Sequence, residues 1–164
     1  MHSRIFGIVD LDYYNTEDFR QGSILDHYED YLPDFADYVN GDVDINEDFD
    51  WLITSLIHST HSSLIEFDKN NLTIKFKPGF KEKYFQEKWD NLIKTLIGNP
   101  NSFNAFCGLN KNVDFSYNLK KLISTEFEFY VSDDYGSYET LDDFIRSVSY
   151  DKEYKVFDVI DYHY

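Results

Sequence analysis

The chain has 164 residues, of which 42% are hydrophobic and 19% aromatic, and its formal net charge is −16. This length indicates one domain with a sizeable core, and the aromatic content excludes a disordered acidic chain. Cys107 is the only cysteine, which excludes a disulfide framework. No apolar run approaches the roughly 20 residues of a membrane span. We therefore expect a soluble cytoplasmic protein, with residues 1–164 forming a single acidic domain.

The charge is unevenly distributed along the chain. Residues 1–50 contain 14 acidic and two basic side chains, residues 51–124 contain six and ten, and residues 125–164 contain 11 and three. Both ends are therefore acidic, whereas the middle is mildly basic.

The first predicted element is a strand at Arg4–Val9, which is short, apolar and β-branched at its end. Gly7 within it indicates a β-bulge or a close approach of another segment. Residues 10–22 form a polar segment that predicts a loop.

A helix is predicted after Ser23, a suitable N-cap, because apolar residues then recur every three or four positions as far as Val39. Pro33 ends or kinks this helix, or opens a second one. Gly41 is a typical helix end.

Asn46 is a suitable N-cap for the next helix, whose apolar stripe is Phe49, Leu52, Ile53, Leu56 and Ile57. Two alternating runs, residues 62–67 and 72–77, predict a hairpin. Residues 80–97 have the clearest helical pattern in the chain. Its apolar face consists of Tyr84, Phe85, Trp89, Leu92, Ile93, Leu96 and Ile97.

The last third of the chain predicts a loop at 99–112, a strand at 113–117 and an ambiguous segment at 119–123. Residues 125–132 alternate, which predicts a strand. Its inward side chains are Phe127, Phe129 and Val131, and its outward ones are Glu126, Glu128 and Tyr130. Thr140 and Asp143 resemble a capping box that opens a helix through Leu141, Phe144, Ile145 and Val148. Residues 155–160 predict a final strand.

This order of elements predicts the α+β class. We expect a single domain with a mainly antiparallel, or mixed, sheet of about five to six strands and about four helices packed on it. Regular alternation of strands and helices is absent, so a doubly wound sheet is the less favoured alternative.

Residues that catalyse reactions or bind cofactors are not clearly indicated. His58 and His61 are three positions apart, but two histidines do not complete a metal site. Cys107 has no identifiable base or orienting group, and every glycine is isolated from the others, so no phosphate loop is present. We therefore expect no enzymatic activity and no cofactor.

A calcium loop is the nearest match to a metal motif. Asp42, Asp44 and Asn46 have the alternating spacing of its first ligands. Glu47 stands where the loop needs glycine, and Ile53 stands where it needs a bidentate glutamate. We therefore expect a polar entry to a helix and no metal site.

The most acidic stretch, residues 23–50, is the predicted binding surface. Carboxylates one helical turn apart recur about every 5 Å, which approaches the spacing of roughly 3.4 Å between phosphates along a DNA strand. Tyrosines between them are favoured at interface hot spots, although their helical spacing is also typical of core residues. The predicted partner-binding residues are Asp26, Glu29, Asp30, Asp34, Asp37, Asp42, Asp44, Glu47, Asp48, Tyr28, Tyr31 and Tyr38.

These features predict an acidic protein inhibitor that occupies the basic nucleic-acid-binding or active-site cleft of a partner protein. The expected partner is a nuclease or a nucleic-acid-binding defence effector. Direct binding of nucleic acid or of a membrane is not expected. The favoured setting is a phage- or plasmid-encoded anti-defence protein of the DNA-mimic type, acting against restriction or CRISPR effectors. The alternative setting is an immunity protein that neutralises a nuclease toxin.

Three further alternatives are open on the sequence. One is a small ligand-binding domain or enzyme with an aromatic-lined pocket. Another is an adaptor that docks its acidic ends on the basic middle of a second copy. The last is a solvated acidic surface without a partner. The sequence does not define the oligomeric state.

Overall fold

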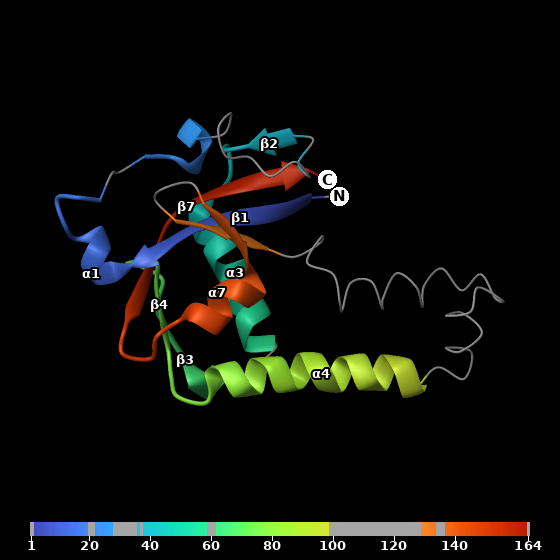
Figure 1. The fold of residues 1–164 in the computed structure, drawn as a ribbon. Helices are drawn as coiled ribbons and strands as arrows, with labels where there is room; N and C mark the ends of the chain where they lie inside the picture. The colour runs from blue at the N-terminus through green and yellow to red at the C-terminus, as the bar shows by residue number, and fades with distance from the viewer. Residues whose placement is uncertain are drawn as a thin grey trace.

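The chain forms a mixed β-sheet with helices packed against it (Figure 1). In the computed structural model the described residues are 2–19, 22–27, 36, 38–58, 62–98, 129–133 and 137–163. The predicted α+β class is confirmed. Within these residues, no helix combines the length and the hydropathy that crossing a membrane requires.

Within the described residues, the sheet has seven strands. They are β1 (His2–Asp10), β2 (Tyr38–Asn40), β3 (Ile65–Asp68), β4 (Thr73–Phe76), β5 (Tyr130–Ser132), β6 (Tyr138–Thr140) and β7 (Glu153–His163). The helices are α1 (Leu11–Tyr14), α3 (Ile45–His58), α4 (Phe80–Gly98) and α7 (Leu141–Ser147), with 3₁₀ turns η1 (Ile24–His27) and η2 (Ser62–Leu64).

Strands β1 and β7 lie at the centre of the sheet, whose order is β3-β4-β7-β1-β5-β6. The pairing of β1 with β5 is parallel, and the other described pairings are antiparallel. One edge of β7 is shared, because its first residues pair with β4 and its last residues pair with β2.

A β-bulge interrupts the pairing of β1 with β7. Gly7 pairs with Asp158 and Ile8 pairs with Val156, so Phe157 is the extra residue. The Phe157 ring lies directly against Gly7, where an added Cβ would be 2.6 Å from Cζ of that ring. The sequence predicted a bulge or a close approach at Gly7, and the structure has both.

Side chains are buried on both faces of the sheet. The larger core cluster joins α3, the first turns of α4, and α7 to one face; it includes Phe6, Phe49, Phe76, Phe80 and Ile145. The smaller cluster lies on the opposite face and contains Ile5, Ile24, Tyr130, Ile160 and Tyr162. Neighbouring residues of β1 therefore point to different clusters, as strand geometry requires.

The helix predicted for residues 23–40 is wrong at both of its described ends. Residues 24–27 form only the 3₁₀ turn η1, and Tyr38–Asn40 form strand β2. Val39 pairs with Tyr162 and packs against the smaller core cluster. This pairing with a strand from the other end of the chain outweighs the local helical periodicity. Residues 28–35 and 37 lie outside the described residues.

One predicted orientation is also wrong. Tyr130 is buried in the smaller cluster, because the strand that carries it is covered on both faces. On α4 only Phe80 and Tyr84 are buried, whereas Trp89 and Ile97 are exposed. In Figure 1 the C-terminal half of α4 extends past the sheet, which leaves this half without a sheet surface to pack on.

The remaining predictions divide as follows. Helix α3, the β3–β4 hairpin, helices α4 and α7, and strand β7 are confirmed. The segment predicted as a loop after β1 contains the short helix α1, which Asp10 caps. Predictions for residues 99–128 lie outside the described residues.

Candidate functional site

Four exposed carboxylates surround the start of α3. We call Asp42, Asp44, Glu47 and Asp50 the α3 acidic surface. Asp44 is the helix N-cap, since its carbonyl accepts from the Asp48 N–H at 3.0 Å and its Oδ1 accepts from the Asn46 N–H at 2.9 Å. The hydrogen bonds from Asn46 and then Glu47 lower the pKa of Asp44, so this carboxylate is ionised at neutral pH.

The predicted cap, Asn46, is instead inside the helix. Asp42 donates its N–H to Oδ1 of Asn40 at 2.9 Å, and Asp50 forms an exposed ion pair with Lys69 at 2.6 Å. In the described parts of the chain, no three His, Cys, Asp or Glu side chains are grouped to hold a metal ion. The residues with the calcium-like spacing, Asp42, Asp44 and Asn46, lie in a turn and at the start of the helix.

Asp48 does not belong to the α3 acidic surface, because it is only 6% exposed. Its Oδ1 accepts from Nε of Arg4 at 2.9 Å, and Nη1 of Arg4 donates to Asp161 at 2.5 Å. The Arg4 guanidinium also lies 5.3 Å from the centre of the Trp51 ring. This partly buried network ties α3 to β1 and β7, so Asp48 helps to hold the helix in place.

Of the other predicted partner-binding residues, the structure describes only Asp26 and Tyr38. Asp26 is exposed on η1, where its Oδ2 accepts from the Ser23 N–H at 3.0 Å, and Tyr38 on β2 is 55% exposed. The residues outside the described part are Tyr28, Glu29, Asp30, Tyr31, Asp34 and Asp37. His61, Cys107 and the side chain of His58 are outside it as well.

A cleft of about 390 Å³ lies at the carboxyl ends of the adjacent parallel strands β1 and β5. We call it the strand-end cleft. Its walls come from β1, β5, β6, α7 and the start of β7, and its polar lining includes Asp10, Asp133, Glu139, Lys152, Tyr13 and Tyr154. Ligands of open sheets commonly bind beyond the carboxyl ends of parallel strands, where the chain order changes direction.

Two of the cleft carboxylates are held by neighbours. Asp10 is paired with Lys152 and accepts from the Asp12 N–H at 2.8 Å. Burial opposes the ionisation of Asp10, but these hydrogen bonds outweigh burial and lower its pKa. Asp133 accepts from the N–H and the hydroxyl of Ser137 at 3.0 and 2.9 Å.

Glu139 is the third cleft carboxylate, and it has no hydrogen-bond or ion-pair partner among the described residues. It is opposite Val131 in the β5–β6 register, so its side chain points to the same face of the sheet as Val131, the face covered by α7. Burial raises the pKa of Glu139, and the charges of Asp143 and Asp133 raise it further.

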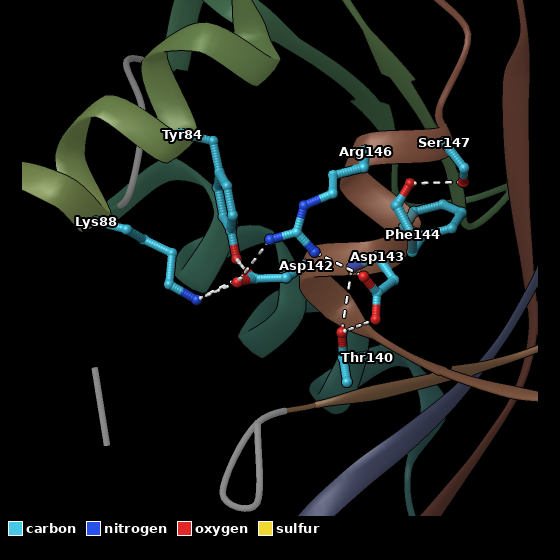
Figure 2. Close-up of polar contacts among 8 residues, drawn as sticks. All are labelled: Tyr84, Lys88, Thr140, Asp142, Asp143, Phe144, Arg146 and Ser147. Atoms are coloured by element: carbon cyan, nitrogen blue, oxygen red, sulfur yellow. Dashed lines mark hydrogen bonds and ion pairs between the residues drawn. The ribbon is translucent and has the colours of Figure 1, made fainter. Parts of the chain in front are cut away.

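Polar contacts fix α7, which forms one wall of the cleft (Figure 2). The Thr140 hydroxyl accepts from the Asp143 N–H at 3.1 Å and donates to Asp143 Oδ2 at 2.7 Å, which confirms the predicted cap. Asp142 is buried and accepts from the Tyr84 hydroxyl at 2.9 Å and from Nζ of Lys88 at 2.7 and 2.8 Å. Helix α7 is thereby fastened to α4.

The sequence patterns did not predict the strand-end cleft. Asp10 is far in sequence from Asp133 and Glu139, and the local signals were two acidic residues, Asp10 and Asp133, that each directly follow a predicted strand. Comparison with protein families, with curated proteins and with solved structures gave no match.

Proposed function

We propose that the protein is an acidic inhibitor that binds the basic nucleic-acid-binding or active-site cleft of a partner protein. The observation that carries this proposal is the α3 acidic surface: four exposed carboxylates on one helix start, in a chain of net charge −16. Glu47 and Asp50 lie about one helical turn apart, which is a spacing of about 5 Å. An array of this density attracts a cationic groove that is built to bind phosphates.

Rigidity of the acidic array supports the proposal. The buried contacts of Asp48 with Arg4 hold the first turn of α3 against the sheet. A preorganised charge array loses little conformational entropy on binding, so more of the electrostatic attraction appears as affinity. Trp51 on α3 and Tyr38 on β2 add exposed aromatic surface, and aromatic residues are enriched at interface hot spots.

The favoured setting is anti-defence: the partner is a restriction or CRISPR effector, and the inhibitor acts as a DNA mimic in the cytoplasm. The alternative is immunity against a nuclease toxin. Both settings require the same physical interaction and no catalysis by this chain. They differ in whether the partner protects a cell or attacks it.

The test compares two variants with the same net charge. The surface variant neutralises the α3 acidic surface with Asp42→Asn, Asp44→Asn, Glu47→Gln and Asp50→Asn, and asparagine at 44 preserves a good N-cap. The control variant neutralises four exposed carboxylates elsewhere with Glu17→Gln, Asp18→Asn, Glu66→Gln and Asp90→Asn. Partners are captured from bacterial lysate at low salt, identified, purified, and assayed for nucleic-acid binding and cleavage.

We expect a basic partner whose nucleic-acid binding is inhibited by the wild-type protein. Inhibition should weaken roughly tenfold or more in the surface variant and much less in the control variant. Equal inhibition by the wild-type protein and a folded surface variant would contradict the proposal. So would a partner that binds the inhibitor and nucleic acid simultaneously.

A small ligand-binding domain or enzyme is the second candidate function. The observation that favours it is the strand-end cleft, whose volume of about 390 Å³ falls in the range of small-molecule sites, about 300–1,000 Å³. Binding of a small molecule in the cleft, with no capture of basic proteins, would favour this candidate over the inhibitor.

A further inference from the structure

We propose that the strand-end cleft binds a small organic cation through its protonated amine or guanidinium group. This inference rests on the second candidate function, namely that the cleft binds a small ligand. It is independent of inhibition through the α3 acidic surface, because none of the four residues of that surface lines the cleft.

The charges that line the cleft do not balance. Three carboxylates, Asp10, Asp133 and Glu139, line it together with one lysine, Lys152. Lys152 is already paired with Asp10, and Asp133 is held by neutral groups of Ser137. The lining therefore has an excess of negative charge, and the Glu139 carboxylate has no ion-pair or hydrogen-bond partner in the described part of the chain.

Glu139 lies where neighbouring charges repel its ionised carboxylate. The residue is partly buried on β6, and the nearest charges that act on it, those of Asp143 and Asp133, are of like sign. Its raised pKa is the expected result of this environment. A bound cation would remove the repulsion and give the carboxylate a charge-assisted hydrogen bond, which is stronger than a neutral one.

The cleft also has an aromatic lining. Tyr13, Phe144 and Tyr154 are among the residues that line the cleft. The Tyr154 hydroxyl accepts from the Ser149 N–H at 2.7 Å, which fixes that ring in position. Aromatic faces attract ammonium and guanidinium groups and also cover the apolar body of a ligand. The combined lining suits a cation with a hydrocarbon or aromatic portion.

An anionic ligand does not suit this site. Lys152 is the only described basic residue in the lining, and its charge is already balanced by Asp10. A phosphate or carboxylate would meet Glu139 and Asp133 with no free cation to stabilise it.

The experiment compares ligands of similar shape and different charge. Tyramine is cationic, N-acetyltyramine is neutral and 4-hydroxyphenylacetate is anionic, and all three have a phenol ring. Agmatine adds an aliphatic guanidinium. Each is titrated into the full-length ¹⁵N-labelled protein, and amide shifts are followed by NMR. We expect tyramine and agmatine to shift amides near Asp10, Asp133 and Glu139, with the neutral and anionic compounds at least about tenfold weaker.

The variant Glu139→Gln should weaken tyramine binding about tenfold, because it removes the unpaired charge. The matched variant Glu66→Gln changes an exposed carboxylate on β3, outside the cleft lining, and should leave binding unchanged. If the neutral or anionic compound binds the cleft as well as tyramine does, the cationic assignment is overturned while the ligand-binding function survives. If no compound shifts cleft amides at millimolar concentration, both are overturned.

Discussion

Asp48, Asp142 and Glu139 are acidic side chains that are fully or partly buried. They differ in whether another side chain compensates for the burial of their charge. Asp48 pairs with Arg4, and Asp142 pairs with Lys88 and accepts from Tyr84. Burial of these two is compensated, since a buried charge is tolerated when it is paired and hydrogen-bonded. Glu139 has no such compensation among the described residues, so its ionised form is a cost to the unliganded protein.

The pH dependence of stability should expose this cost. The pKa of Glu139 is raised in the folded state by burial and by Asp143 and Asp133. A raised carboxyl pKa means that the folded protein holds the proton more tightly than the unfolded chain does. The stability that the protonated Glu139 side chain contributes is therefore complete below the pKa of the unfolded chain, about 4.3. It is lost as the pH rises through the pKa of the folded protein.

We expect Glu139→Gln to raise the free energy of unfolding at pH 7 by about 0.5 kcal/mol, a small value because the site is partly screened by solvent. Near pH 3.5 the variant and the wild type should have the same stability, because the wild-type carboxyl is then protonated. Thermal denaturation across this pH range, in buffers free of amines, measures the difference. A variant less stable than the wild type at pH 7 would show that Glu139 has a compensating partner.

Strand β7 organises the sheet at the level of elements. It pairs along one edge with β1, and its other edge is divided between β4 and β2. Phe157 is the extra residue of the bulge, and its ring packs on Gly7 and on Phe19, at a centroid distance of 5.3 Å from the latter. The long pairing of β1 with β7 therefore requires a residue without a side chain at Gly7.

Gly7→Ala should therefore destabilise the protein by about 1–3 kcal/mol, because the new Cβ displaces the Phe157 ring or bends β1. The matched control is Gly98→Ala at the end of α4, where a Cβ meets nothing within 4 Å. That change should be neutral or stabilising by up to about 1 kcal/mol. Urea denaturation of both variants measures the contrast.

A double variant separates steric overlap from other effects. Adding Phe157→Leu to Gly7→Ala should recover part of the lost stability, because the smaller side chain leaves room for the methyl group. Equal stability of Gly7→Ala and the wild type would mean that the ring is free to move away from β1 at no cost.

Self-repulsion is the dominant electrostatic property of the whole molecule, given a net charge of −16. The exposed ion pairs, such as that of Asp50 with Lys69, contribute little. The fold is supported instead by the two apolar clusters on either side of the sheet. Conditions that screen charge should therefore favour the folded state.

We expect the melting temperature to increase when NaCl is raised from ~0.01 M to ~1 M, as the Debye length falls from about 30 Å to about 3 Å. The four-residue surface variant should show a smaller increase, because less repulsion is left to screen. Differential scanning calorimetry at a series of salt concentrations measures both. A melting temperature that falls with salt would indicate that paired charges, such as Arg4 with Asp48, outweigh the repulsion.

Several elements were determined by local sequence. The apolar stripe from Phe49 to Leu56 is enough to specify α3, and the alternating runs around Asn70 are enough to specify the β3–β4 hairpin. The start of α7 follows from Thr140 and Asp143, whose hydrogen bonds join residues three positions apart. These signals are local because periodicity, turns and caps involve only neighbouring residues. The acidity around α3, and hence the exposed part of the proposed binding surface, is equally evident in the sequence.

Contacts between distant segments were decided only by the tertiary structure. Val39 is in a strand because Tyr162 lies beside it, Asp48 is withdrawn from the acidic surface because Arg4 reaches it from β1, and Tyr130 is buried because its strand is covered on both faces. The strand-end cleft likewise exists only once β5 lies parallel to β1. Strand pairing and ion pairing depend on which remote groups the fold brings together. The residues next to a position in the sequence do not specify these long-range partners.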